Sequence, residues 1–276
     1  MVPQPLYAHL WGGYWQTGRF EASEPMKKPA PALPDWPYPR WIAHRGAGKL
    51  APENTLAAFR EGARYGYRMF ECDAKLSADG VVFLLHDDTL DRTTDGQGLA
   101  GDQPWSSLNR RDAGRWHSRQ FAGEPLPTLE AVARFCRANA CLLNIEIKPT
   151  PGLEEETGRV VALEAARLWA DADVLPLLTS FQPHALAGAK AVAPHLPRGL
   201  LLETLWDGWL AHAQSLGCAA IVCDEVLWDA GTMAAVHGAG LRALAYTVNE
   251  PGEARRLWAL GIDSLITDRV DMFAPD

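Results

Sequence analysis

Histidines and carboxylates stand at the ends of short apolar segments in this chain. Such groups must be hydrated, paired or bound to a metal, because burying a lone charge is costly. His44 and His86 could supply an acid and a base near neutral pH. Glu71, Asp73 and Glu146 offer the oxygen ligands that Mg²⁺ or Ca²⁺ prefers. These residues predict metal-assisted acid–base chemistry.

Two cations accompany this set. Arg45 follows His44, and Lys148 lies two residues after Glu146, on the same face of a strand. A guanidinium fork and a lysine ammonium both hold phosphate oxygens well, so the combination indicates a metal-assisted phosphodiesterase. Salt bridges of Arg45 to Glu53 and of Lys148 to Glu146 are the alternative. Both interpretations hold together if Glu53 lies behind Arg45 and orients it.

Glu71 and Asp73 are two residues apart on a predicted strand, so they project from one face and Cys72 from the other. Two like charges on one inward face repel each other unless a cation lies between them. No thiolate accompanies them, so magnesium or calcium fits better than zinc. Taken singly, each carboxylate is better explained as a rim residue or an ion-pair partner, and only the combination with two histidines indicates a metal site.

Composition sets wider bounds. The chain has 276 residues, 47% of them hydrophobic, and a net charge of −8. No basic stripe is present, which argues against nucleic acid as a partner but not against a small anionic substrate. No segment reaches the ~18 apolar residues of a membrane span, and no signal peptide is recognisable, so we expect a cytoplasmic protein without stable membrane association. The cysteines form no CxxC pair and are expected to be buried thiols, at positions Cys72, Cys136, Cys141, Cys218 and Cys223.

Short apolar runs alternate with amphipathic stretches from residue 41 onward, which predicts a (β/α)₈ TIM barrel within residues 39–276. An open dinucleotide-binding sheet is disfavoured, because no GxGxxG follows the first strand. The expected strands span residues 41–45, 69–76, 142–148, 177–181, 199–203, 219–223, 241–248 and 263–267.

Two segments depart from this alternation. Residues 1–38 are rich in proline and are expected to form an extended arm, in which Met26 offers an alternative translation start. After the second strand, residues 77–80 predict a tight turn, and pairing 77 with 80 would place His86 opposite Glu71. Residues 88–126 then form an excursion too long for an ordinary loop, which predicts a small insertion beside the barrel mouth.

The order and content of these motifs resemble the glycerophosphodiester phosphodiesterase family, in particular its short bacterial cytoplasmic enzymes. The resemblance covers residues 35–272 and rests on His44-Arg45-Gly46, Ala51-Pro52-Glu53-Asn54-Thr55, Glu71-Cys72-Asp73, His86-Asp87-Asp88-Thr89-Leu90-Asp91-Arg92-Thr93-Thr94, Glu146-Ile147-Lys148, Thr247-Val248-Asn249 and Thr267-Asp268.

This resemblance implies a barrel with an insertion after its second strand, and hydrolysis of deacylated phospholipids to sn-glycerol 3-phosphate and an alcohol. It implies that one divalent cation, Mg²⁺ or Ca²⁺, binds to the three carboxylates. It further implies that His44 and His86 form the acid–base pair and that Arg45 and Lys148 hold the phosphate.

Three alternatives remain open from the sequence. One is a lysophospholipase D- or sphingomyelinase D-like phosphodiesterase on the same barrel, which an apolar patch near the mouth would favour. Another is a metal-dependent sugar isomerase, which would not need both Arg45 and Lys148. The third is a non-catalytic phosphate-binding barrel, against which His44 and His86 count. Trp206 and Trp209 follow the fifth expected strand and are candidate outer contacts for a headgroup, although helix packing explains them equally well.

Overall fold

The computed structural model describes residue 33 and residues 35–275. Most of the proline-rich arm, including Met26, lies outside these residues. Eight parallel strands close into a barrel, because the first strand pairs with both the second and the last. The expected strands are confirmed as β1 (Trp41–Ala43), β2 (Met69–Leu76), β4 (Leu142–Ile147), β5 (Leu177–Ser180), β6 (Arg198–Leu202), β7 (Ala220–Asp224), β8 (Arg242–Tyr246) and β9 (Ser264–Thr267).

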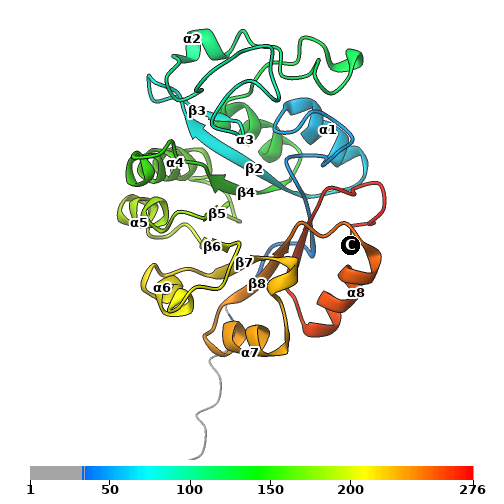
Figure 1. Ribbon diagram of the computed structural model, residues 1–276, viewed down its shortest axis with the longest axis vertical. Helices are drawn as coiled ribbons and strands as arrows, with labels where there is room; N and C mark the ends of the chain where they lie inside the picture. Colours follow the sequence, from blue (N-terminus) through cyan, green and yellow to red (C-terminus); the bar gives the residue numbers. More distant parts are fainter. Residues whose placement is uncertain (1–32, 34, 276) are drawn as a thin grey trace, which may run out of the picture.

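Helices surround this barrel (Figure 1). Two of them begin at threonines whose side chains accept a backbone N–H, Thr55 from Ala58 and Thr128 from Ala131. The outer helices are α1 (Leu56–Arg64), α3 (Leu129–Ala138), α4 (Glu154–Leu168), α5 (Pro183–Val192), α6 (Trp209–Ser215), α7 (Ala230–Gly238) and α8 (Pro251–Leu260), and a short 3₁₀ turn spans Glu225–Leu227. This is the (β/α)₈ barrel that the alternating pattern predicts.

Alternate residues of each strand serve two separate cores. One face of the strands packs against the helices, and the other fills the barrel interior with Ile42, Met69, Leu177, Leu244 and their neighbours. All five cysteines are free and buried, as expected. No helix in the part of the chain that the structure describes is long and apolar enough to cross a membrane.

The residues before β1 contribute to the barrel interior. The side chain of Trp36 donates to Ser264 Oγ at 3.1 Å, and the Tyr38 hydroxyl donates to the Leu175 carbonyl at 2.8 Å. Tyr38 is buried among the residues that fill the barrel. The packed body therefore includes this short stretch ahead of the first strand.

The hairpin after β2 forms, but with a different register from the predicted one. Strand β3 (Val82–Leu84) pairs Ala74 with Leu84, so the residue that would face Glu71 by extension is 87 rather than His86. The reason lies in the turn, where the Ser77 amide donates to the Val81 carbonyl and Gly80 adopts φ +79°. A glycine in the left-handed region adds a third residue to the loop and shifts the pairing by one.

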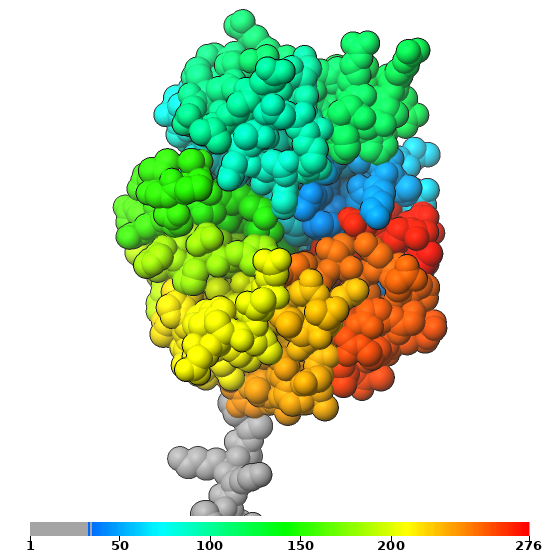
Figure 2. All heavy atoms as spheres, in the orientation of Figure 1, coloured from blue at the N-terminus to red at the C-terminus, as the bar shows by residue number. Residues whose placement is uncertain are grey.

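The residues between β3 and α3 form the insertion, which has its own small core. Phe83 and Leu85 of the hairpin pack there with Leu90, Leu108 and Leu126. Its regular structure is limited to α2 (Trp105–Leu108) and one 3₁₀ turn (Arg119–Phe121). Figure 2 shows it in teal and green at one end of the barrel, beside the blue segment that follows β1. The insertion therefore borders the carboxyl ends of β1 and β2.

Gly48 allows the loop after β1 to approach the loop after β9 at the mouth of the barrel. It has φ +55°, and a Cβ there would lie 2.1 Å from the backbone oxygen of Asp268. We predict that Gly48→Ala lowers the free energy of unfolding by more than the ~1–2 kcal/mol of a left-handed backbone alone. It should also lower kcat, because Asp268 contacts His44.

Gly98→Ala is the matched control, since Gly98 has φ +80° and nothing within 4 Å of its Cβ position. Urea unfolding and steady-state kinetics of the two variants provide the measurements. Equal losses of stability in both variants would contradict the close-approach argument.

Candidate active site

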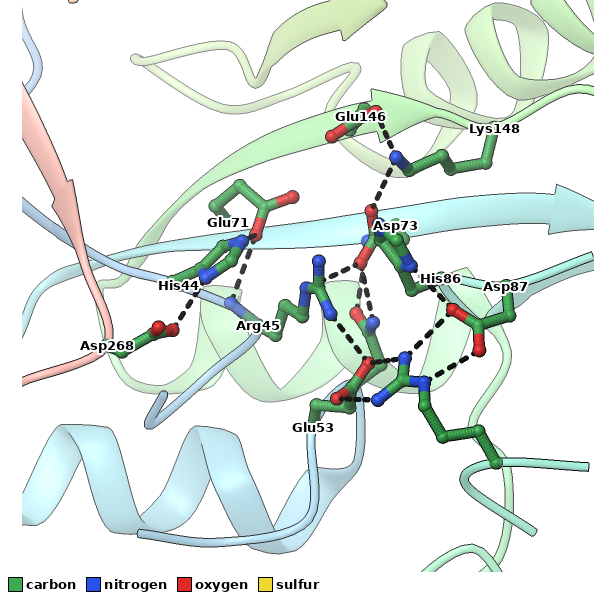
Figure 3. A network of polar contacts seen from close by, with 12 residues as sticks. His44, Arg45, Glu53, Glu71, Asp73, His86, Asp87, Glu146, Lys148 and Asp268 are labelled. Atoms are coloured by element: carbon green, nitrogen blue, oxygen red, sulfur yellow. Dashed lines mark hydrogen bonds and ion pairs between the residues drawn. The ribbon is translucent and has the colours of Figure 1, made fainter. Parts of the chain in front are cut away.

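The seven predicted site residues meet at the carboxyl ends of three neighbouring strands (Figure 3). His44 and Arg45 follow β1, Glu71 and Asp73 lie on β2, and Glu146 lies on β4 with Lys148 just beyond it. His86 arrives from the insertion side, immediately after the hairpin. In parallel (β/α)₈ barrels this end of the sheet carries the active site.

Three carboxylates are buried together. Glu71, Asp73 and Glu146 are only 3%, 1% and 9% exposed, and one oxygen from each lies within 4.8 Å of the others. Glu71 Oε1 and Asp73 Oδ1 are buried and accept no hydrogen bond. Buried polar atoms almost always form hydrogen bonds, so two carboxylate oxygens that lack one fit a site for a bound cation, although Lys148 Nζ lies 3.7 Å from Asp73 Oδ1.

Burial and mutual repulsion shift the titration of this trio. Burial first, and then the charges of the other two carboxylates, raise the pKa of Glu71 well above its usual value. Burial and Asp73 raise the pKa of Glu146 to about 7. Burial acts on Asp73 as well, but Arg45 and Lys148 outweigh it and lower the pKa of that carboxyl. A divalent cation would relieve the repulsion, and the all-oxygen donor set suits magnesium or calcium.

His44 is held by an aspartate that the sequence analysis gave no role. The Nδ1 atom of His44 lies 2.7 Å from Asp268 Oδ1, and Asn249 donates to the other oxygen of Asp268 at 3.2 Å. The Nε2 atom of His44 lies 3.8 Å from Glu71 Oε2 and so faces the carboxylates. A carboxylate on one ring nitrogen fixes the tautomer and leaves the other nitrogen for chemistry.

His86 has the same support. Its Nδ1 atom lies 2.7 Å from Asp87 Oδ1, and its ring stands beside Asp73 (Figure 3). Burial and the nearby cations lower the pKa of His86 despite the opposing effect of Asp73. The imidazole is therefore neutral at neutral pH and can accept a proton. Within the sequence, the only indication that Asp87 supports His86 is that it directly follows it.

Arg45 and Asn54 both hold Asp73 in place. Arg45 Nε lies 3.4 Å from Asp73 Oδ2, while the Asn54 side chain donates to that oxygen at 2.7 Å and accepts from the Asp73 amide at 3.0 Å. The Arg45 amide also donates to Glu71 at 3.0 Å. Arg45 and Asn54 both have a positive φ, of 50° and 58° respectively. Strained backbone of this kind costs of order 1–3 kcal/mol and concentrates at functional sites.

The predicted salt bridges are present. Lys148 lies 2.7 Å from Glu146 and 3.7 Å from Asp73, and Arg45 lies 2.8 Å from Glu53. The two cations thus adjoin the carboxylates and can still face a phosphate at the mouth. Glu53 lies behind Arg45, in the position that would orient it.

Arg92 joins the two halves of the site, a role that its place in the His86–Thr94 motif did not reveal. Its guanidinium makes paired hydrogen bonds of 2.8 Å to both oxygens of Glu53 and bonds of 2.7 and 2.9 Å to those of Asp87. Through these partners it connects Arg45 with His86. The residue belongs to the insertion, and only the folded loop brings it to Glu53, 39 positions earlier in the chain.

A (β/α)₈ barrel with two histidine–aspartate pairs, a buried carboxylate trio and two cations at its mouth has the groups of a metal-assisted phosphodiesterase. Residues 44–272 match the model of the glycerophosphoryl diester phosphodiesterase family. The chain belongs to this family.

Relatives and solved structures agree with this assignment. A glycerophosphodiester phosphodiesterase of Caldanaerobacter subterraneus is 33% identical over 82% of this chain and 93% of its own. An Oleispira antarctica phosphodiesterase, solved in complex with the product sn-glycerol 3-phosphate, is 34% identical in sequence to this chain. The two structures match with a TM-score of 0.78 over 83% of this chain and 93% of that one. A glycerophosphodiester phosphodiesterase from Agrobacterium tumefaciens is 29% identical, with a TM-score of 0.73 over 86% and 99%.

Glu71→Gln tests the carboxylate repulsion. The pKa values of Glu71 and Glu146 are raised in the folded protein. These two carboxyls therefore leave the free energy of unfolding of the metal-free protein unchanged below their ordinary pKa of 4.5. They lower it as the pH rises toward and past about 7. We therefore predict that in EDTA at pH 8 the variant melts about 2–4 °C higher than the unmodified chain, the equivalent of ~1 kcal/mol. Added Ca²⁺ or Mg²⁺ should stabilise the unmodified protein and not the variant.

The control is Glu130→Gln, which removes a half-exposed glutamate that pairs with surface arginines. Melting curves at pH 5 and pH 8, with and without metal, provide the comparison. A lower melting temperature for Glu71→Gln in EDTA at pH 8 would show that the carboxylate stabilises the metal-free fold.

Arg92→Ala tests the link between the two halves of the site. Loss of a group that orients a ligand or a base typically costs 10–100-fold. We expect kcat to fall by that factor with little change in KM, and Arg92→Lys or added guanidinium to restore part of it. Arg134→Ala, which breaks an exposed pair on α3, is the control. A normal kcat in Arg92→Ala would show that Glu53 and Asp87 hold their positions unaided.

Proposed function

We propose that this protein hydrolyses glycerophosphodiesters to sn-glycerol 3-phosphate and an alcohol, with one Mg²⁺ or Ca²⁺ bound to Glu71, Asp73 and Glu146. The observation that carries the proposal is the grouping of three buried carboxylates, with oxygens that accept no hydrogen bond, beside two aspartate-supported histidines. The bound product of the Oleispira antarctica relative supports the same substrate class.

The residues divide the work by position. A divalent cation at the trio would neutralise charge that develops on the phosphate oxygens. Arg45 and Lys148 would hold the remaining non-bridging oxygens, the first as a fork and the second as a point charge. Their present ion pairs with Glu53 and Glu146 keep both side chains at the mouth before substrate arrives.

The two histidines would share the proton transfers. His86 is poised as a base, because its pKa is lowered and Asp87 fixes its Nδ1. His44 presents Nε2 to the site while Asp268 holds Nδ1. One imidazole accepts a proton from the attacking oxygen and the other returns a proton to the leaving alcohol, so both are required for turnover.

A second candidate activity has one supporting observation. Leu153, Leu205, Trp206 and Val226 are exposed apolar residues on loops that follow β4, β6 and β7. These connections lie at the same end of the strands as the site, so their apolar side chains would be on hand for the acyl chain of a lipid substrate. Hydrolysis of lysophospholipids, in the manner of a lysophospholipase D, is therefore the alternative, and lysophosphatidylcholine belongs in the substrate panel.

The decisive assay measures release of glycerol 3-phosphate from glycerophosphocholine with and without EDTA. Chelation should abolish release, and Mg²⁺ or Ca²⁺ should restore it. His44→Ala and His86→Ala should each slow turnover by about 10²–10⁴-fold. The double variant should cost much less than the product of the two, because the pair acts as a unit.

His195→Ala is the control, because His195 is exposed on the loop before β6, at the opposite end of the strands. Full activity after exhaustive chelation would rule out the metal. Release of choline from lysophosphatidylcholine, without release of glycerol 3-phosphate from glycerophosphocholine, would favour the second activity. An unchanged rate in His86→Ala would remove that residue from the chemistry.

A further inference from the structure

A cavity of about 380 Å³ extends from the catalytic groups toward the insertion. Its lining includes His44 and Arg45 of the site, and also Lys49, Trp116 and His117, which we call the outer wall. None of the three outer residues has a role in the metal site or the histidine pairs. The cavity therefore continues the site beyond the position expected for the phosphate.

The outer wall is fixed in place by the insertion. The ring atom Nε2 of His117 donates to the Lys49 carbonyl at 3.0 Å, which ties the insertion to the loop after β1. The indole N–H of Trp116 donates to the Ala113 carbonyl at 2.8 Å. The rings of Trp116 and His117 meet edge to face, with their centroids 5.7 Å apart. Trp116 is held by these contacts yet remains 40% exposed, so its ring is available to a ligand.

The charges of the lining favour some ligands over others. The lining carries three fixed cations, on Arg45, Lys49 and Arg92, and two carboxylates, on Glu53 and Asp268. Both arginines are engaged in ion pairs, so Lys49 is the cation that a ligand would meet. Both carboxylates are already engaged, the first by the two arginines and the second by His44. Among the described residues Lys49 forms no ion pair. A cationic headgroup would thus meet a like charge without a free carboxylate to compensate for it.

We propose that this cavity binds the leaving alcohol of the diester and selects polyols, such as inositol or glycerol, over quaternary ammonium headgroups. The inference rests on the proposed hydrolysis and names its substrate class. The exposed indole face of Trp116 packs against the C–H groups of a polyol, and Lys49 is a donor for its hydroxyls. A choline would gain from one aromatic face but would be repelled by Lys49.

Trp206 is the rival headgroup contact and also the matched control. It is likewise 40% exposed, but it lies on the loop after β6, packs edge-on to His212 and does not line the cavity. Trp209, the other candidate outer contact, packs against the core, in agreement with the helix-packing alternative.

The experiment compares kcat/KM for glycerophosphoinositol and glycerophosphocholine, which share the glycerol 3-phosphate half. We expect the unmodified enzyme to prefer inositol by about tenfold, a typical effect of one good pocket contact. Trp116→Ala should remove most of that preference and leave inhibition by glycerol 3-phosphate unchanged. Lys49→Glu should shift the preference toward choline, and Trp206→Ala should alter neither quantity.

Three outcomes would overturn the inference. Equal losses on both substrates in Trp116→Ala, with weaker inhibition by glycerol 3-phosphate, would show that the cavity holds the glycerol half. A changed preference in Trp206→Ala and not in Trp116→Ala would place the headgroup at the β6 loop. A choline preference in the unmodified enzyme that Lys49→Glu leaves unchanged would refute the charge argument.

Failure of the hydrolysis itself is distinguishable. An unmodified enzyme that cleaves neither diester refutes the proposed function, and the cavity is then tested by calorimetry. In the His86→Ala background, glycerophosphoinositol should bind about tenfold more tightly than glycerophosphocholine, and Trp116→Ala should remove the difference. Equal binding of the two diesters in that background would refute the cavity assignment as well.

Discussion

The repulsion among three buried carboxylates is the constraint on which the rest of the site depends. Glu71, Asp73 and Glu146 share a space too small for three negative charges without compensation. Arg45 and Lys148 supply part of the compensation, and they in turn need Glu53 and Glu146 to hold them at the mouth. The site thus stores unfavourable electrostatic energy, which a divalent cation and a phosphate would convert into binding. Apolar side chains pack the barrel interior below the mouth and support the strands that carry this site.

The two histidines of the proposed acid–base pair depend on different parts of the fold. His44 comes from the start of the barrel and Asp268 from its last strand, so the His44 pair forms only when the barrel closes. His86 and Asp87 are adjacent in sequence, but their position depends on the hairpin and on Arg92. Closure of the barrel therefore forms one histidine–aspartate pair, and docking of the insertion positions the other.

The fold and the inner ring of the site could be predicted from residue types and spacing. The strand pattern located the barrel, and strand alternation placed Glu71 and Asp73 on one face. Asp268, Asn54 and Arg92 were beyond that reasoning, because contacts between distant loops give them their roles. The hairpin register was wrong by one residue, because the conformation of Gly80, which lengthens the turn, cannot be deduced from an Ala-Asp-Gly sequence alone.

Strand β2 continues beyond its pairing with β4 and there pairs with β3. Because one strand carries both the carboxylates and the base of the insertion, the position of the cut matters when the insertion is replaced by that of another protein. One end of the strand carries the carboxylates, and the other pairs with β3, from which the insertion grows. A graft that replaces residues 93–126 leaves Asp87 and Arg92 in the host and changes only the outer wall with Trp116. A graft that begins at residue 86 or 87 also removes supports of the catalytic centre. With the roles proposed above, the boundary between headgroup recognition and chemistry falls just after Arg92, inside the insertion rather than at its edge.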